Sequence, residues 1–404
     1  MIETTSEVEV APSSLISADP AWSCRWCASQ HGVRVLDAGL QPPSDLHPQP
    51  SDPEPDPEYP LAMVMCLDCR LVQLESDPTT PEEPRRQEPR ALVEQAEAAI
   101  KDAEAHGYLQ PGMRVLEYPS PHGGSWVEQL ERRFLVEVSD GPAELLVDIF
   151  GMMHDADQRA ALTRRVSQMS PDAILLMQFH TVAAIVRSGF WNALRHGHFA
   201  YYSTPVVVRM AAELGLTAVT AREYSLYGGT IVLALAKTGS RWGDQGDSVT
   251  SLIEGEKSEG VLDPATVASL NESLARSAAG LASYLSDAKS RSETVAGYSA
   301  ASRASALMSC GRVTAQDLVA VADAAPGLHG RAMPGSRIPI VAPNDLVTMR
   351  PDKVLLFVPD LLNEVRQALP EIERNGGRWV VIDPMPREIA PAALANELKL
   401  PRPC

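Results

Sequence analysis

The stretch MRVLEYPSPHGGSWVEQLERRFLVEVSDGPAELLVDIFGMMHDADQRAALTRRVSQMSPDAILLMQF (residues 113–179) alternates short apolar runs with longer mixed segments. Its three apolar runs have the length and composition of buried strands, and they lie at 113–118, 144–150 and 173–179. The two segments between them have the spacing of helices, and they lie at 125–134 and 155–169. Strands that alternate with helices predict a parallel sheet, so this stretch predicts an α/β domain.

The chain after this stretch predicts an extension of the same sheet and then a second α/β unit. Apolar runs at 216–225 and 229–237 have no helix between them and predict antiparallel strands at the sheet edge. A polar linker at 238–248 precedes a predicted helix at 263–288, with Asp263 as N-cap and Pro264 in the first turn. Five more strands are predicted, at 294–300, 317–324, 337–343, 353–359 and 378–384.

The chain before this stretch contains two Cys-x-x-Cys pairs, Cys24–Cys27 and Cys66–Cys69. Each pair places two thiolates on one tight turn, and two such turns supply the four soft ligands that tetrahedral Zn²⁺ prefers. Four thiolates leave no open coordination position, so the predicted zinc is structural. Cys310 and Cys404 stand alone.

Proline separates the cysteine pairs and marks the domain boundaries. Eight of the 33 prolines lie in residues 41–60, which predicts a long loop that a metal site would close at both ends. A second polar stretch at 76–89 leads into a predicted helix at 92–107 that ends at Gly107. We therefore predict three units. They span residues 1–89, 90–240 and 241–404.

Charge and hydropathy restrict the classes of partner. The chain of 404 residues has 52 acidic and 35 basic side chains and a net charge of −17, which disfavours nucleic acid and anionic membranes. No run of about 18 apolar residues occurs, and the first twenty residues are neither basic nor hydrophobic. We expect a cytoplasmic protein with a small-molecule substrate.

Several motifs resemble one known family. They are CRWC (24–27), LDAG (36–39), PLAMVMCLDCRLVQL (60–74), RHGHFAYYS (195–203), LYGGT (226–230), VAGYSAASRAS (295–305), PGSRIPIVAPNDLVTMRPDKVLLF (334–357) and NGGRWVVIDPMP (375–386). Together they are similar to the zinc-binding deoxysugar C-methyltransferases of secondary metabolism, which act on nucleotide-linked ketosugars. The resemblance covers nearly the whole chain, and the zinc and C-terminal motifs match best.

The resemblance implies a fold and an activity. The fold would be a small zinc-binding module, a middle methyltransferase-like Rossmann domain and a C-terminal Rossmann-like α/β domain. The activity would be transfer of a methyl group from S-adenosylmethionine to a carbon of a nucleotide-linked ketosugar, after removal of a proton α to the ketone.

Two departures from the family fall on the cofactor site. The family turn Glu-x-Gly-Ser-Asn-Asp-Gly is here Glu117-Tyr118-Pro119-Ser120-Pro121-His122-Gly123-Gly124, in which two prolines remove backbone N–H groups. Only 27 residues separate Glu117 from Leu145, which predicts a shortened domain without the segment that normally grips the ribose. The predicted cofactor contacts are Glu117, Tyr118, Gly123 and Gly124.

A third departure concerns acid–base residues. The family core Tyr-His-Glu-His aligns with Arg195, His196, Gly197 and His198, and the histidine of the family's His-Gly-Gly turn aligns with Tyr227. His198 is at the position of the family's base, so we predict that it removes the proton. A histidine after the second strand is retained as His154. Arg195 is expected to stabilise an enolate oxygen or a phosphate.

The substrate contacts implied by the resemblance are Tyr201, Tyr298 and Arg303. Arg303 begins a predicted helix, where backbone N–H groups attract phosphate. Because the chain is acidic, a diphosphate pocket must be locally basic, and Arg195, Arg303 and Arg337 are the candidate cations. The plain alternatives are that His154 and His198 are satisfied core residues, that Tyr201 only packs, and that the turn before Arg303 holds no ligand.

Three functions remain open at this point. The first is C-methylation of a nucleotide-linked ketosugar. The second keeps the substrate and the base but needs no methyl donor, as in an epimerase or a dehydratase or lyase. The third is a catalytically dead family member that serves as a protein partner.

Overall fold

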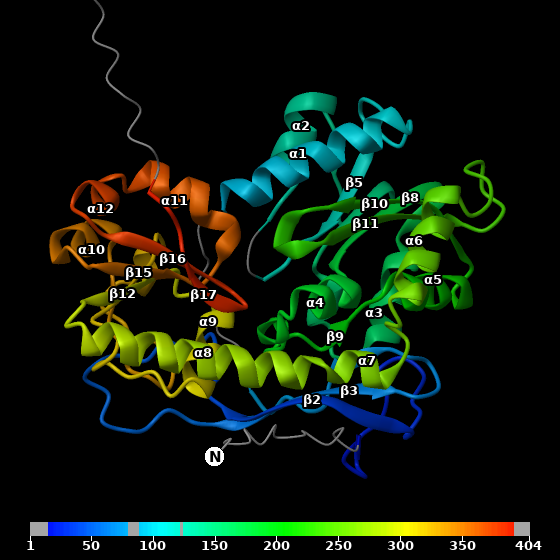
Figure 1. Ribbon diagram of the computed structural model, residues 1–404. Coiled ribbons are helices and arrows are strands. Elements are labelled where there is room, and N and C mark those ends of the chain that lie inside the picture. The colour runs from blue at the N-terminus through cyan, green and yellow to red at the C-terminus, as the bar shows by residue number, and fades with distance from the viewer. Residues whose placement is uncertain (1–14, 80–88, 122–123, 392–404) are drawn as a thin grey trace, which may run out of the picture.

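The computed structural model describes residues 15–79, 89–121 and 124–391 and contains three sheets. In Figure 1 a middle unit in green and a C-terminal unit in orange and red stand side by side, and the N-terminal strands in blue run beneath both. The long helix α8 (Leu270–Ser290) lies along the same base. The predicted combination of a small module and two α/β units is confirmed.

The N-terminal sheet is antiparallel and has the order β1-β2-β3-β4-β9. Its strands are β1 (Ile16–Ser17), β2 (Gly32–Gln41), β3 (Tyr59–Cys66), β4 (Val72–Leu74) and β9 (Ala200–Tyr201). The stretch between β2 and β3 contains no helix or strand, as its prolines predict. The last strand, β9, comes from the middle of the chain, so this sheet joins the zinc module to the segment that follows His198.

The middle sheet has the order β10-β11-β8-β7-β5-β6. Its strands are β5 (Arg114–Tyr118), β6 (Glu137–Val138), β7 (Ala143–Ile149), β8 (Met169–His180), β10 (Leu216–Tyr224) and β11 (Thr230–Lys237). Strands β6, β5, β7 and β8 are parallel, while β11 pairs antiparallel with both β8 and β10. This is a Rossmann-like sheet that ends in an antiparallel hairpin, as predicted, and β6 is reduced to two residues.

Helices cover both faces of the middle sheet. They are α1 (Arg90–Ala105), α2 (Val127–Phe134), α3 (Gln158–Ser167), α4 (Val182–Ser188), α5 (Thr204–Glu213) and α6 (Asp247–Ser258). Sequence analysis did not predict α6, which begins inside the proposed linker. Because α6 packs on β10 and α5, it adds to the middle unit, and the boundary proposed at residue 240 stays a prediction.

The C-terminal sheet has the order β14-β13-β12-β15-β16-β17 and contains all five strands predicted there. Its strands are β12 (Val295–Tyr298), β13 (Val321–Ala322), β14 (Ile340–Val341), β15 (Lys353–Leu356), β16 (Arg378–Asp383) and β17 (Met385–Glu388). Five strands are parallel, and the unpredicted β17 is antiparallel. Its sequence, MPRE, has no apolar run that would have indicated a strand.

The helices of the C-terminal part begin with one that differs from its prediction. The helix expected over 263–288 is broken at Ser269 into α7 (Pro264–Ala268) and α8, and Asp263 caps α7 through the N–H of Ala265. The remaining helices are α9 (Ser302–Cys310), α10 (Pro343–Met349), α11 (Leu362–Ala368) and α12 (Glu371–Arg374).

One apolar cluster joins the three parts of the chain. It contains Leu36 of β2, Ile185 of α4, Leu281 of α8 and Leu355 of β15, all fully or almost fully buried. A shared core of this kind fixes the relative positions of the units more firmly than a polar interface would. Among the helices that the structure describes, none has the length and apolar character needed to cross a membrane.

Candidate functional site

A cavity of about 290 Å³ lies where the carboxyl ends of the two α/β sheets face each other. Ser120, Phe150 and His180 reach it from the ends of β5, β7 and β8. Tyr298 and Asp323 reach it from the ends of β12 and β13. Ligands of open α/β sheets bind at the carboxyl ends of the strands, so both sheets present their usual binding edge to one space.

The cavity collects every predicted catalytic and substrate residue. These seven residues are His154, Arg195, His198, Tyr201, Tyr227, Tyr298 and Arg303. They come from four segments of two units, and only the family resemblance connected them in the sequence. Their roles stay predictions, but their gathering around one space is what those roles require.

Arg195 and His198 form a bonded pair in this cavity. The Arg195 Nε–H donates to His198 Nε2 at 2.6 Å, and the same guanidinium donates to the Ser302 hydroxyl at the start of α9. The Nε2 atom of His198 is therefore an acceptor, and its ring proton belongs on Nδ1. The lone pair expected to accept the substrate proton is engaged by Arg195, which also connects the two units.

Tyr201 holds the backbone of Arg195 in place through a hydrogen bond. The buried phenol oxygen accepts the backbone N–H of Arg195 at 3.1 Å, and burial raises the pKa of Tyr201, so the ring stays neutral. Only 2% of the residue is exposed. Its hydroxyl thus has a defined partner in the protein, and the residue supports the loop as well as lining the cavity.

His154 packs edge-on against His198, with ring centroids 4.6 Å apart. Its Nδ1–H donates to the carbonyl of Gly197 at 2.9 Å, which fixes the tautomer with the lone pair on Nε2. Burial, helped by the positive charge of Arg195, lowers the pKa of His154 to about 3. The ring is therefore neutral near pH 7.

Tyr227 lies at the turn between β10 and β11, in a left-handed backbone conformation with φ of 55°. The guanidinium of Arg303 lies over its ring, 5.1 Å from the centroid. Gly229, at φ 148°, permits the turn, because a Cβ there would approach the Cβ of Ala184 to 2.6 Å. The turn is thus fixed by groups from both units.

His180 was missed by sequence analysis. It is the last residue of β8 and lines the cavity beside Tyr227, with ring centroids 6.5 Å apart. Burial first, and then the charge of Arg303, lower its pKa to about 3. The one signal available was its place directly after a predicted parallel strand, at the edge where ligands bind.

Glu117 and Tyr118, at the start of the cofactor turn, make contacts that stabilise the fold. The Glu117 carboxylate accepts the Trp126 N–H and the Ser125 hydroxyl, each at 2.7 Å, at the start of α2. The Tyr118 ring stacks under Arg165, 4.2 Å from its guanidinium carbon. A Cβ on Gly151 would lie 2.6 Å from the Tyr118 carbonyl oxygen, so the ends of β5 and β7 are in close contact.

The described part of this turn therefore does not fit S-adenosylmethionine in the family's manner. The Glu117 carboxylate is bonded at the start of α2, and among the described residues of the turn only Ser120 lines the cavity. Gly124 has a φ of 94° and does not line it, while His122 and Gly123 lie outside the described residues. The cofactor contacts named from the sequence stay predictions.

The four paired cysteines form the predicted metal centre. The Sγ atoms of Cys24, Cys27, Cys66 and Cys69 all lie within 4.8 Å of one another. Cys24 and Cys69 are 3.4 Å apart, and Cys27 and Cys66 are 3.6 Å apart. A tetrahedral zinc with Zn–S bonds of about 2.3 Å places sulfurs about 3.8 Å apart, so the four residues fit structural Zn²⁺.

The zinc module supports the segment that contains His198. The Leu74 N–H, at the end of β4, donates to the Phe199 carbonyl at 3.2 Å, and the Arg25 guanidinium lies over the Phe199 ring. The Asp77 carboxylate accepts the Gly197 N–H, and the His196 ring donates to the Pro60 carbonyl at 3.1 Å. His196 therefore serves this contact and does not line the cavity.

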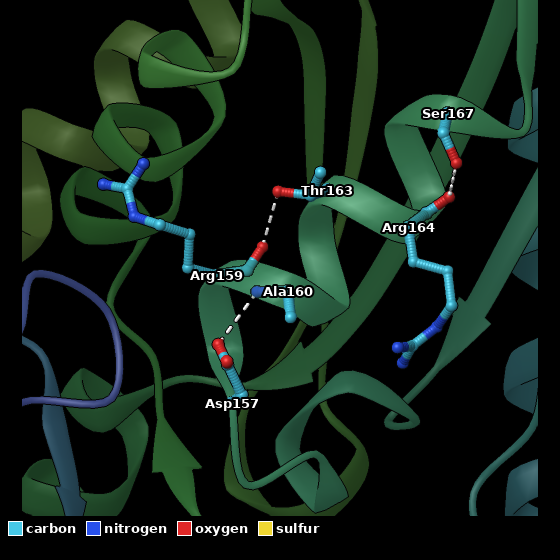
Figure 2. A pocket seen from close by; sticks show the side chains of 6 residues that line it. All are labelled: Asp157, Arg159, Ala160, Thr163, Arg164 and Ser167. Atoms are coloured by element: carbon cyan, nitrogen blue, oxygen red, sulfur yellow. Dashed lines mark hydrogen bonds between the residues drawn. The ribbon is translucent and has the colours of Figure 1, made fainter.

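A second, shallow hollow lies on α3 and is shown in Figure 2. Asp157 accepts the Ala160 N–H, while the Thr163 and Ser167 hydroxyls donate to carbonyls of the same helix. These side chains are satisfied within one helix, and no predicted site residue is among them. We assign no function to this hollow.

The fold and the four-cysteine centre define a zinc-containing protein with a Rossmann-like domain of the methyltransferase class. Residues 24–83 match the family model described as "Putative zinc binding domain", and residues 225–386 match the model of the C-methyltransferase C-terminal domain. The C-methyltransferase NovU of Streptomyces niveus is 25% identical over 270 residues, which are 65% of this chain and 64% of that protein. Two regions of the chain are therefore similar to the zinc-binding and C-terminal domains of C-methyltransferases, and the match spans a little less than two thirds of the length of NovU.

The solved structures add little. An O-methyltransferase family protein from Burkholderia thailandensis has 13% identity and a TM-score of 0.28 over 37% of this chain and 59% of its own. The magnesium protoporphyrin IX methyltransferase of Synechocystis PCC 6803 has 9% identity and a TM-score of 0.28 over 37% and 84%. Scores this low support no argument, and the fold is assigned from the sheet order above.

Proposed function

We propose that the protein is a C-methyltransferase of a nucleotide-linked ketosugar, and that the cavity removes a proton α to the ketone. The observation that carries this proposal is the convergence of three histidines and two arginines on one space between facing carboxyl edges. An imidazole lone pair can act as a general base, and guanidinium groups stabilise the enolate oxygen that forms.

The charges around the cavity support an anionic, diphosphate-bearing substrate. The chain as a whole carries −17, yet Arg195 and Arg303 both line this space. Arg337, the third cation named from the sequence, does not line it and instead binds Asp56 at 2.6 Å. Two arginines therefore supply cations that could bind a diphosphate, and the lining also contains the carboxylates of Asp323 and Glu364.

The methyl donor implied by the family is S-adenosylmethionine, which supplies an electrophilic methyl group when it is bound. Because Glu117 is committed to α2, a second candidate function has specific support: an enolising enzyme that needs no methyl donor, such as an epimerase or a lyase. Both candidates share the proton abstraction and differ in what the enolate does next.

The experiment incubates the zinc-loaded protein with a thymidine diphosphate-linked 4-keto-6-deoxyhexose, with and without S-adenosylmethionine, and analyses the sugar by mass spectrometry. C-methylation predicts a mass gain of one methylene unit only with the donor. A sugar that gains deuterium in D₂O, or loses water, without gaining a methylene unit would favour the second candidate. An unchanged sugar in D₂O, with its α proton retained, would contradict both.

A further inference from the structure

The C-terminal sheet has the strand order that is typical of dinucleotide-binding Rossmann domains. Numbered from β12, the order β14-β13-β12-β15-β16-β17 is 3-2-1-4-5-6, with β17 antiparallel, so the chain reverses direction across the sheet between β12 and β15. Ligands of open α/β sheets bind at such a reversal, outside the carboxyl ends of the strands. The cavity lies there, because Ser299 and Ser302 line it after β12 and Val358 lines it after β15.

Asp323 is a carboxylate in a cavity whose proposed substrate is an anion. It directly follows β13, the second strand in this numbering, and lines the cavity although only 9% of the residue is exposed. A carboxylate repels the diphosphate of a nucleotide and therefore serves a different part of the ligand. In dinucleotide-binding domains of this order, an acidic residue about 20 residues after the first turn accepts a ribose hydroxyl. Asp323 lies 23 residues after Ala300, which is in that turn.

Two backbone N–H groups hold the carboxylate of Asp323 in place. One oxygen accepts the N–H of Ala300 at 2.7 Å, and the other accepts the N–H of Ala325 at 2.8 Å. An ionised carboxylate has about four acceptor positions, so each oxygen retains one after these bonds. The side chain is thus fixed to the turn between β12 and α9 and can still accept a hydroxyl group.

The hydroxyl of Tyr298 is a second polar group that faces the cavity. Tyr298 is the last residue of β12, is only 7% exposed and lines the cavity. Its ring packs edge-on against Trp379, with centroids 5.9 Å apart, but no residue that the structure describes forms a hydrogen bond with its hydroxyl. Burial first, and then the charges of Asp323 and Glu364, raise the pKa of Tyr298 to about 12, so the hydroxyl keeps its proton and can donate. Buried polar groups normally have a hydrogen-bond partner, which a ligand would supply.

We propose that the C-terminal unit binds the nucleoside diphosphate of the substrate and that the Asp323 carboxylate accepts the ribose 3′-hydroxyl, an inference that rests on the proposed function. The Tyr298 hydroxyl donates to the same nucleoside diphosphate, and Arg303, which lines the cavity beside them, binds its phosphates. The sugar then extends from the diphosphate toward Arg195 and His198 on the middle unit, where the proton is removed. Asp323 is therefore a specificity residue, because it selects nucleotides that carry this hydroxyl.

Isothermal titration calorimetry of the zinc-loaded protein tests this contact without turnover. The ligands are thymidine diphosphate and 2′,3′-dideoxythymidine diphosphate, which differ only in the 3′-hydroxyl. Asp323→Asn retains one oxygen acceptor but removes the charge, and Tyr298→Phe removes only the phenol hydroxyl. Asp345→Asn is the matched control, because Asp345 is exposed on α10 of the same unit and does not line the cavity.

We expect the wild type to bind thymidine diphosphate about tenfold more tightly than the dideoxy compound, because hydrogen bonds to charged groups are the stronger ones. In Asp323→Asn this ratio should fall to about threefold or less. Tyr298→Phe should weaken both ligands by about threefold and leave the ratio unchanged. Asp345→Asn should change neither affinity.

Equal binding of the two ligands by the wild type would overturn the assignment of Asp323, and so would an unchanged ratio in Asp323→Asn. If Asp323→Asn does not fold, Asp323→Glu replaces it, because its displaced carboxylate should lose the same preference. No binding of either ligand would also overturn the inference. The proposed function fails separately, only if the intact ketosugar keeps its α proton in D₂O.

Discussion

The zinc module and the cavity differ in how their residues come together. The module uses two short cysteine pairs whose spacing alone indicates a metal, and the four sulfurs gather as expected. The cavity uses residues from at least five segments of two α/β units, and its arginine and histidine side chains bond to one another in ways that no spacing indicates. A site built from a local motif can therefore be predicted from sequence. For a site assembled from distant segments, sequence predicts some of the residues but not the contacts between them.

The zinc module and the cavity are also connected by hydrogen bonds. Strand β4 follows the second cysteine pair and pairs with β9, with Val72 opposite Tyr201. The segment from Arg195 to Tyr201 is thus bonded to the zinc module on one side and to α9, through Ser302, on the other. Loss of the zinc module should therefore also disturb the cavity.

The largest expected effect is that of removing zinc. Chelation, or Cys66→Ser, should lower the melting temperature by more than about 10 °C, because a structural zinc site contributes its binding free energy to folding. Cys310→Ser is the control, since this half-buried cysteine lies outside the cluster and should change stability by less than about 1 kcal/mol. Calorimetry with zinc analysis measures both, and a zinc-free protein with an unchanged melting curve would contradict the structural role.

Acid should destabilise the protein through the cavity histidines. The pKa of His154 and that of His180 are each about 3 in the folded chain, below the ordinary value of about 6.5, so the unfolded chain binds more protons below that pH. Their stabilisation is complete above about pH 6.5 and is lost as the pH falls toward 3. Each of these two histidines should lower the free energy of unfolding by about 2 kcal/mol when the pH falls from 7 to 5.

Denaturant titrations at pH 7 and pH 5 measure this loss. His154→Asn keeps the donor to the Gly197 carbonyl and should reduce the difference between the two pH values by about 2 kcal/mol. The exposed His106→Asn should leave the difference unaltered. If His154→Asn behaves like the control, then the imidazole is protonated in the folded protein and is not the neutral group described here.

The smallest expected effect separates the cofactor turn from the cavity. Glu117→Gln weakens two hydrogen bonds at the start of α2 and should lower the free energy of unfolding by about 1–2 kcal/mol. If the turn serves the fold, the heat of S-adenosylmethionine binding should be the same in both proteins. Loss of that heat with unchanged stability would show that the carboxylate contacts the cofactor.

Sequence reasoning predicted the periodic elements well. The apolar runs became strands in all three stretches of 113–179, because a buried parallel strand needs a continuous apolar run. It missed α6, whose first residues are Asp247 and Ser248 and whose apolar residues are few, and β17, which has no apolar run. These elements form because tertiary contacts outweigh weak local preference.

In the site, the resemblance named residues but not their bonds. Arg195 was expected near an enolate or a phosphate, and the structure adds its bond to His198, which depends on a three-residue turn closing in a particular way. Glu117 was expected to contact a cofactor, but it accepts hydrogen bonds from Ser125 and Trp126. The sequence did not predict these bonds, because they depend on where α2 begins relative to β5. His180 lies in none of the motifs that resemble the family, so the sequence did not indicate it.

We propose above that the cavity between the two α/β units removes a proton α to a ketone. The most direct measurement is proton NMR of a thymidine diphosphate-linked 4-keto-6-deoxyhexose incubated in D₂O with the zinc-loaded wild-type protein. We predict that the α-proton signal disappears at a rate proportional to enzyme concentration. Retention of that signal, with a folded protein and a saturating ketosugar, would contradict the claim.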